Sequence, residues 1–337
     1  MPLSDGATPH PSDAGPDENA AARQFALSIP EEDLFQLAQT RFAPYIFYPP
    51  ERPMVFVKSG GPQRQGEGDM QILAFNWLRQ VRQENPDCNI HVPEVFKIFS
   101  RGRLTFIIMQ LVEAAPVLRF AKTLHPLTWN HDKSRYCKMI AEGVYLLSLM
   151  PVPADATPGP YTCGERRIGH LLFSDFRAPI VYPTIQQLED HLNRVHVAAA
   201  TDIWVVSILA KRALQVAERG YRRNPHPPRI TLEKKLIYCY TDFNDENFMF
   251  AIDPDGRIRL YIIDFEHASF LPPSLLTFAI FEPGHRWFLC PWIAEKFGSS
   301  LPKIDMEVMN RIFYMFQISG GTVGLRERKS VPATSRQ

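Results

Sequence analysis

Three residues with oxygen-bearing side chains, Asp242, Asn247 and Asp264, lie close together in the last third of the chain. Carboxylate and amide oxygens suit Mg²⁺, which usually takes one or two carboxylates from a protein and completes its shell with phosphates and water. The residue types therefore point to a magnesium-dependent reaction on a phosphate compound, provided that the fold brings the three side chains to one place.

A predicted β-hairpin supplies that proximity. The turn sequence Asp-Pro-Asp-Gly at residues 253–256 lies between the apolar segments 248–252 and 257–263. Proline presets the second turn position and glycine suits the fourth. Asn247 precedes the first strand and Asp264 follows the second, so antiparallel pairing places them at the same end, where paired positions lie roughly 5 Å apart. An Asp/Asn-rich loop alone is usually a solvated turn, but an acid directly after residues 260–263 requires a partner if it is buried.

A family resemblance rests on these residues. Asp242 and Asn247, five positions apart, resemble the Asp-x-x-x-x-Asn catalytic loop of the protein-kinase superfamily, and Asp264-Phe265 resembles its metal-binding motif. The loop at 242–247 is more similar to aminoglycoside phosphotransferases, and the run at 263–266 to the choline-kinase-like branch. Asn244 stands where Ser/Thr protein kinases have lysine, and no Ala-Pro-Glu motif follows. Both features favour a small-molecule substrate over a protein substrate.

The resemblance implies an α+β, two-lobed protein-kinase-like fold, with a small β-rich N-lobe and a larger, mainly helical C-lobe. It also implies an ATP- and Mg²⁺-dependent transfer of the γ-phosphate to a small-molecule hydroxyl. Asp242 would be the catalytic residue, and Asn247 and Asp264 would hold the metal. The segment 112–116 looks like the hinge that contacts adenine.

A lysine further upstream fits the same scheme. Lys58 ends the predicted strand 54–58 and is similar to the lysine that grips the ATP phosphates. Its acidic partner should lie on the helix that follows. Asp69 is the first choice, because it shares a helix face with apolar residues at 72 and 73, and Glu67 is the second. Each has an alternative interpretation, since lysine at a strand end is commonly a surface charge and an acid at a helix start favours the helix dipole.

The rest of the chain divides into two ordered parts. Alternating and helical apolar patterns predict a helix at 69–81, strands at 95–99 and 104–111, and a helix at 134–150. We expect a disordered N-terminal segment over 1–24, an N-lobe over 25–114, a C-lobe over 115–325 and a disordered tail over 326–337. The segment 164–170, with Arg166 and Arg167, could line a substrate site, although a plain surface loop is the commoner outcome.

Composition excludes several classes. The net charge is +1 and 45% of residues are hydrophobic, so no global field favours nucleic acid or a membrane surface. The most apolar stretch, 106–118, is too short and too polar to span a bilayer. Five widely spaced cysteines without a CxxC pair argue against a disulfide framework or a zinc site. These features favour a cytoplasmic protein whose partner is a small molecule, with no obligate protein partner evident.

Two departures from the family pattern leave an alternative open. The catalytic loop begins Tyr240-Thr241 where the family usually has His-Gly, and no glycine-rich loop precedes Lys58. Glycine allows backbone amides to approach a phosphate closely. A pseudokinase-like binding module, which keeps the fold but performs no chemistry, therefore stands beside the phosphotransferase hypothesis.

Overall fold

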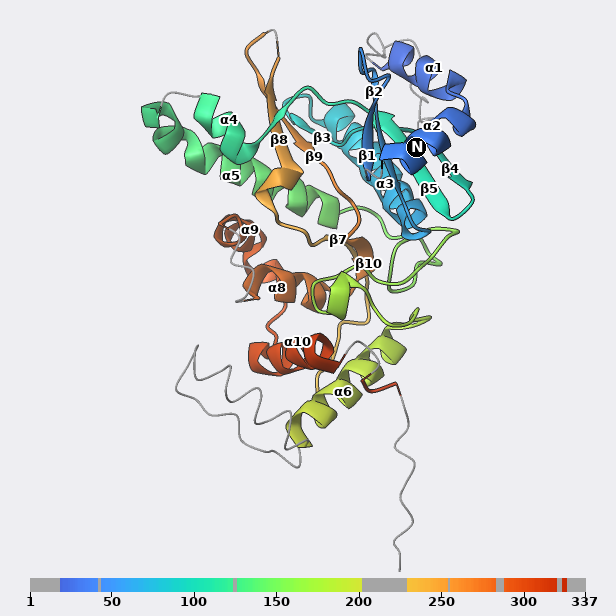
Figure 1. Cartoon of the computed structure of the whole chain (residues 1–337). Helices are drawn as coiled ribbons and strands as arrows, with labels where there is room; N and C mark the ends of the chain where they lie inside the picture. Colours follow the sequence, from blue (N-terminus) through green and yellow to red (C-terminus); the bar gives the residue numbers. More distant parts are fainter. Residues whose placement is uncertain are drawn as a thin grey trace, which may run out of the picture.

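The computed structural model describes residues 19–41, 44–123, 126–201, 229–253, 255–282, 288–319 and 323–325. Its first part is a four-stranded antiparallel sheet in the order β1-β2-β5-β4 (Figure 1). These strands are β1 (Tyr45–Tyr48), β2 (Val55–Gly60), β4 (Val95–Arg101) and β5 (Leu104–Gln110). The strands expected at 54–58, 95–99 and 104–111 are therefore present, with ends shifted by one or two residues.

Alternation along β2 sets the direction of each side chain. Val55, Val57 and Ser59 are buried, and Val55 and Val57 join a small core with helices α1 (Ala20–Ser28) and α2 (Glu31–Arg41). Because successive side chains of a strand point to opposite faces, Lys58 lies on the other side of the sheet. On that side lies the long helix α3 (Gln63–Glu84), which contacts β2, β4 and β5.

A second four-stranded sheet has the order β3-β9-β8-β6. It contains the expected hairpin, β8 (Phe248–Ile252) and β9 (Ile258–Ile262), together with β3 (Ile90–His91) and β6 (Ala115–Pro116). A separate antiparallel pair joins β7 (Ile237–Tyr240) to β10 (Ala268–Leu271). The short strand β3 pairs with β9, so residues from both expected lobes share one sheet, and the division at residue 114 stays a prediction.

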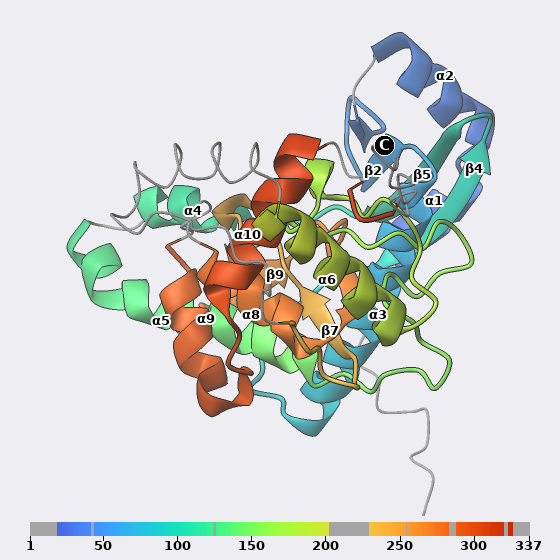
Figure 2. The same ribbon diagram turned by 90° about the horizontal axis from the view of Figure 1, so that it is seen from below.

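The later part of the chain is mainly helical and contains the larger core (Figures 1 and 2). Figure 2 shows α6, α8 and α10 grouped near β7, with α9 next to α8. The helices after β6 are α4 (Val117–Thr123), α5 (Pro126–Ser148), α6 (Ile185–Thr201), α8 (Pro273–Phe281), α9 (Cys290–Phe297) and α10 (Met306–Ser319). The chain is thus α+β, with an antiparallel sheet first and helices later, which confirms the expected fold class.

Two expectations about elements need correction. The expected disorder over 1–24 is wrong for its last residues, because α1 begins at Ala20 and Arg23 forms an ion pair with Glu94 at 2.7 Å. Residues 1–18 and the expected tail 326–337 lie outside the described residues. The helix expected at 69–81 begins six residues earlier, at Gln63. That earlier start changes which acid faces Lys58.

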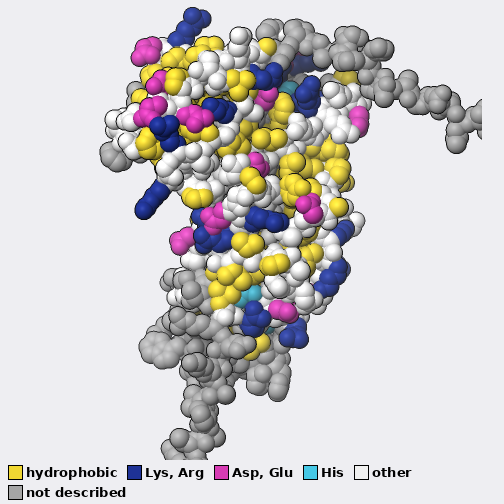
Figure 3. All heavy atoms as spheres, turned by 90° about the vertical axis from the view of Figure 1, so that its right-hand side faces the viewer, with side chains coloured by type: hydrophobic (Ala, Val, Ile, Leu, Met, Phe, Trp, Pro, Cys, Tyr) yellow, Lys and Arg dark blue, Asp and Glu magenta, His cyan; other side chains and the backbone are white. Residues whose placement is uncertain are grey.

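The described surface carries both charge signs. On the face seen in Figure 3, Lys and Arg side chains lie among Asp and Glu side chains and hydrophobic groups, without a broad patch of one sign. No helix among the described residues is long and apolar enough to cross a membrane.

Candidate active site

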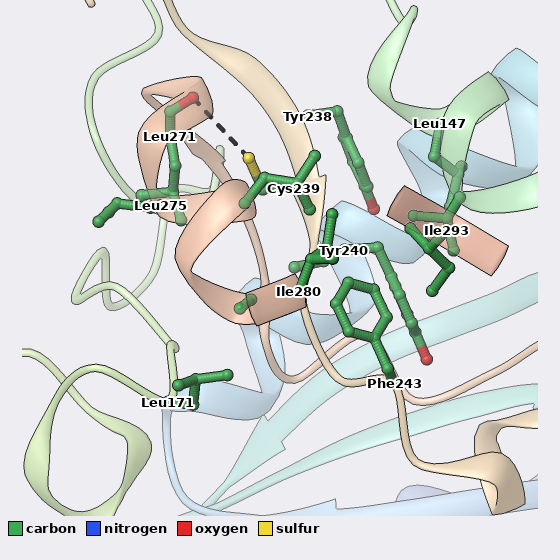
Figure 4. Close-up of a cluster of buried hydrophobic side chains, with 14 of the residues drawn as sticks. Leu147, Leu171, Tyr238, Cys239, Tyr240, Phe243, Leu271, Leu275, Ile280 and Ile293 are labelled. Atoms are coloured by element: carbon green, nitrogen blue, oxygen red, sulfur yellow. Dashed lines mark hydrogen bonds between the residues drawn. The ribbon is translucent and has the colours of Figure 1, made fainter. Parts of the chain in front are cut away.

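The loop that carries Asp242 is anchored in the core on both sides. Tyr240 and Phe243 are buried and lie close together in the hydrophobic cluster beneath the loop (Figure 4). The Tyr240 hydroxyl donates a hydrogen bond of 2.6 Å to the carbonyl oxygen of Ile263, the residue before Asp264. The tyrosine at the start of the loop therefore ties the Asp242 loop to the segment that carries Asp264.

Asp242 lies against a histidine that the sequence analysis did not identify. One carboxylate oxygen is 3.5 Å from Nδ1 of His267, and the other accepts a hydrogen bond from the backbone N–H of Asn244 at 3.2 Å. Burial opposes ionisation of Asp242, but its interactions with His267 and the hydrogen bonds from Asn244 and Asn247 together outweigh burial, so the pKa of Asp242 is lowered. Burial also disfavours the charged form of His267, but Asp242 outweighs it and raises the histidine's pKa. Asp242 is thus an ionised carboxylate, as a proton acceptor must be.

The hairpin brings Asn247 and Asp264 to one end. Phe248 and Ile262 are paired residues of β8 and β9, and the backbone N–H of Ile263 donates to the carbonyl of Asn247 at 3.0 Å. The Asn247 amide donates to the backbone carbonyl of Asp242 at 3.4 Å. The three residues singled out in the sequence therefore converge, and their catalytic and metal-binding roles stay predictions.

Asp264 has an unusual backbone conformation. Its φ of 60° is in the left-handed region, which is uncommon for residues other than glycine, although aspartate enters it more readily than most. Such conformations are common at functional sites, where surrounding contacts impose them. Oδ1 of Asp264 is buried, accepts no hydrogen bond within the described part of the chain and lies 3.1 Å from Lys58 Nζ. The side chain is thus held at the cavity beside a cation.

Lys58 also pairs with a fully buried acid. Its Nζ lies 2.7 Å from Oε1 of Glu67, whose side chain is 1% exposed, and the other Glu67 oxygen binds Arg64. Burial would lower the pKa of Lys58, but the neighbouring carboxylates outweigh it and raise that pKa. Arg64 in turn reaches Glu266 at 3.0 Å. Lys58 and Arg64 are therefore held by three acids, Glu67, Asp264 and Glu266.

The first choice of partner for Lys58, Asp69, is wrong. Asp69 instead accepts hydrogen bonds from the Gln65 amide at 3.0 Å and from the Thr162 hydroxyl. Two residues along a helix correspond to a rotation of about 200°, so Glu67 and Asp69 face opposite ways. Only two residues separate the end of β2 from the start of α3, and the position of this helix that faces Lys58 is Glu67.

A cavity of about 330 Å³ opens between the first sheet and the hairpin. Lys58, Asn247 and Asp264 line its polar end, and Leu111 and Val112 line the connection that leaves β5. Its remaining lining residues are mostly apolar: Phe47, Phe56, Pro93, Met109, Gln110, Glu246, Met249 and Ile263. An apolar slot that ends in a lysine, an acid and an amide matches the two halves of a nucleotide, a flat base and a charged phosphate chain.

Carboxylate oxygens gather around Asp264, and a magnesium ion takes oxygen ligands of this kind. Among the described residues, one carboxylate oxygen each from Glu67, Asp264 and Glu266 lies within 4.8 Å of the others. Asp264 belongs both to this group and to the pair predicted from the sequence, and its buried Oδ1 accepts no hydrogen bond from the described residues, although Lys58 Nζ lies 3.1 Å away. Asp264 is therefore the residue that best fits a hard cation with oxygen ligands.

Comparisons with known proteins bear on the fold. No family profile matches the sequence, and no curated protein matches it. Solved structures do match. An aminoglycoside phosphotransferase in complex with GDP and kanamycin is 14% identical, with a TM-score of 0.41, over 78% of this chain and 76% of that one. Aminoglycoside phosphotransferase APH(3'') from Streptomyces rimosus is 14% identical, with a TM-score of 0.37, over 85% and 98%.

A fructosamine-3-kinase from Haemophilus somnus, described as putative, is 13% identical, with a TM-score of 0.35, over 80% of this chain and 77% of that one. These solved structures are what the chain is similar to in structure, at 13–14% sequence identity. The role of each residue in this chain rests on the geometry described above.

Proposed function

We propose that this protein is an ATP- and Mg²⁺-dependent phosphotransferase that transfers the γ-phosphate to a hydroxyl group of a small molecule. The observation that carries the proposal is the convergence of Lys58, Asn247 and Asp264 at the polar end of one cavity, with ionised Asp242 beside them. Phosphoryl transfer needs little covalent chemistry from a protein, so positioning and charge compensation supply most of the rate enhancement.

Each residue has a part in the proposed reaction. Lys58, held by Glu67, binds the nucleotide phosphates, and the apolar walls hold the base. Asp242 orients the acceptor hydroxyl and accepts its proton as the new oxygen–phosphorus bond forms. Asn247 and Asp264 would hold Mg²⁺, which neutralises charge on the phosphates.

Two variants test the proposal. We expect Mg²⁺-ATP to raise the melting temperature of the protein, since a ligand at one hundred times its Kd stabilises by about 2.7 kcal/mol. The shift should require Mg²⁺ and should be lost in Asp264→Ala. Asp242→Asn should keep the shift and lose phosphoryl transfer by several orders of magnitude. Near-full turnover in Asp242→Asn would contradict the assignment.

One observation favours a second candidate, a pseudokinase-like binding module. The segment before Lys58 contains prolines at 49, 50 and 53 and no glycine, so the close backbone approach of a glycine-rich loop to phosphate is missing. If millimolar Mg²⁺-ATP produces no melting shift in the unmodified protein, this candidate replaces the phosphotransferase.

A further inference from the structure

A second cavity, of about 270 Å³, shares no lining residue with the first. It opens between the start of α3, the segment 160–177 and the residues that follow Asp264. Among its lining residues are Glu67 and Glu266, which border the proposed metal site, and His267, which contacts Asp242. His267 thus lies both in the wall of this cavity and 3.5 Å from Asp242, the proposed catalytic carboxylate.

The wall formed by 160–177 is fixed in place. A Cβ atom at Gly169 would lie 2.5 Å from the carbonyl oxygen of Glu266, so this wall packs directly on the backbone beside the catalytic residues. His170 is fully buried, and its ring nitrogens contact the Leu275 carbonyl at 3.1 Å and the Leu172 N–H at 3.0 Å. Groups presented by this segment are therefore held at a set distance from His267.

Two arginines on this wall share a single acid. Arg167 donates to one oxygen of Glu165, and Arg177 donates to the other. A guanidinium group carries five N–H donors. Within the described part of the chain, Arg167 and Arg177 each donate to one side-chain acceptor, an oxygen of Glu165. The side chains are 39% and 30% exposed, so their remaining donors can reach a ligand in the cavity. The pair offers planar donors of the kind that bind carboxylate and phosphate.

An aromatic ring borders the path from the arginines to Asp242. Phe176 stacks on His267, with ring centres 5.2 Å apart and planes 23° from parallel. Asp175 and Phe176 have φ values of 52° and 55°, a left-handed conformation that aspartate tolerates but that is unfavourable for a bulky aromatic residue. The Phe176 side chain is 42% exposed, so burial in the core does not require this conformation. Backbone hydrogen bonds hold the turn, from His170 N–H to the Phe176 carbonyl at 2.8 Å and from Phe176 N–H to the Phe173 carbonyl at 3.1 Å.

The acids that line the cavity are mostly engaged. Glu67 and Glu266 are both paired with Arg64, on the side nearer the proposed nucleotide site. Glu165 is held by the two arginines. Asp175 is the remaining acid of the lining, and it is exposed, so solvent and salt screen its charge. Three of the four acids of the lining are therefore paired with arginines.

We propose that this cavity binds the acceptor, and that the acceptor carries an oxyanion, a carboxylate or a phosphate, which docks on Arg167 and Arg177. This inference rests on the proposed function. The acceptor's hydroxyl lies toward Asp242, its oxygen attacks the γ-phosphorus of ATP, its proton passes to Asp242, and ADP leaves with the electrons of the broken oxygen–phosphorus bond. Placing the anion on the far wall keeps it away from the nucleotide phosphates.

The test measures binding without nucleotide, so it does not depend on catalysis. Four probes share one polyol chain: sorbitol, gluconate, sorbitol 6-phosphate and glucamine, which is the amine analogue. Titration calorimetry on the full chain should show that gluconate or sorbitol 6-phosphate binds at least about tenfold more tightly than sorbitol and glucamine, as charge-assisted hydrogen bonds predict. The tighter of the two identifies the oxyanion.

Arg167→Gln and Arg177→Gln should each weaken the tighter oxyanion about tenfold and leave sorbitol unchanged. Arg103→Gln, on the exposed turn between β4 and β5, is the matched control. Arg177→Lys keeps the charge if Arg177→Gln does not fold. Equal binding of all four probes, or undiminished oxyanion binding in the folded arginine variants, overturns the inference. If the oxyanion binds but ATP is not consumed, the cavity assignment stands and the proposed function fails.

Discussion

The change Glu67→Gln, compared with Asp69→Asn, should identify which acid of α3 is the partner of Lys58. It leaves a side chain of nearly the same shape but removes the charge that Lys58 and Arg64 share. Lys58 and Arg64 are 16% and 15% exposed, so neither cation gains much solvation in return. Removing one partner of a buried ion pair typically costs about 3–5 kcal/mol, because the other charge stays buried.

The surrounding carboxylates set the size of the effect. Lys58 keeps Asp264 at 3.1 Å and Arg64 keeps Glu266 at 3.0 Å. The loss of stability should therefore fall at the lower end of the range, about 3 kcal/mol. At roughly 2 °C per kcal/mol for a chain of this size, the melting temperature should fall by about 6 °C or more. Nucleotide affinity should also fall, since Lys58 would shift toward Asp264.

Asp69→Asn is the matched control, because it removes an acid from the same helix two residues away. Asp69 is half-buried and only accepts hydrogen bonds from Gln65 and Thr162. Its loss should cost about 1 kcal/mol or less and leave Mg²⁺-ATP binding unchanged. Thermal melting with and without Mg²⁺-ATP measures both quantities. If the two variants lose equal stability and equal nucleotide affinity, the assignment of Glu67 as the partner of Lys58 is refuted.

Two further changes probe the wall of the second cavity. Burial lowers the pKa of His170 from 6.5 to about 3, so the unfolded chain binds a proton there that the folded chain does not. The contribution of His170 to the free energy of unfolding is therefore complete above pH 6.5 and falls by about 1.4 kcal/mol for each pH unit below that value. His170→Gln should flatten this part of the stability profile, measured by denaturant titration at pH 7 and pH 5. Gly169→Ala should destabilise the protein by more than about 1 kcal/mol, because its Cβ would meet the backbone of Glu266, whereas Gly256→Ala, with nothing within 4 Å, tests the cost of a positive φ alone.

The hairpin could be predicted because its information is local. A proline–glycine turn between two apolar segments determines both strands and their pairing, and the pairing places Asn247 beside Asp264. The side of the sheet on which Lys58 lies can be predicted for the same reason, since alternation along β2 places it on the face opposite Val57. In both cases the contacts join residues whose relation follows from a strand period and a short turn.

The position of α3 was harder to predict. Its apolar periodicity is clear only from residue 72 onward, and the preceding turns contain glycines at 66 and 68, which weaken a helix signal. A Cβ atom at Gly68 would lie 2.5 Å from the Ile98 side chain, so this glycine allows α3 to pack closely on β4. The residue that lowers helix propensity is thus required by packing, and the phase of the helix, which selects Glu67 over Asp69, depends on that packing.

His267 and the arginines of the second cavity show the limit of the local signal. Three positions after Asp264, His267 could have been noticed, but its contact with Asp242 spans 25 residues and requires the β7–β10 pairing. Arg177 pairs with Gly169 in a β-bridge, and Gly169 in turn packs against the backbone of Glu266, almost one hundred residues away in the sequence. If the acceptor is chosen by this wall, then sequences that share the hairpin can differ in substrate through 160–177 alone. Exchanging that segment between two such proteins should therefore change acceptor preference while the nucleotide-dependent melting shift is kept.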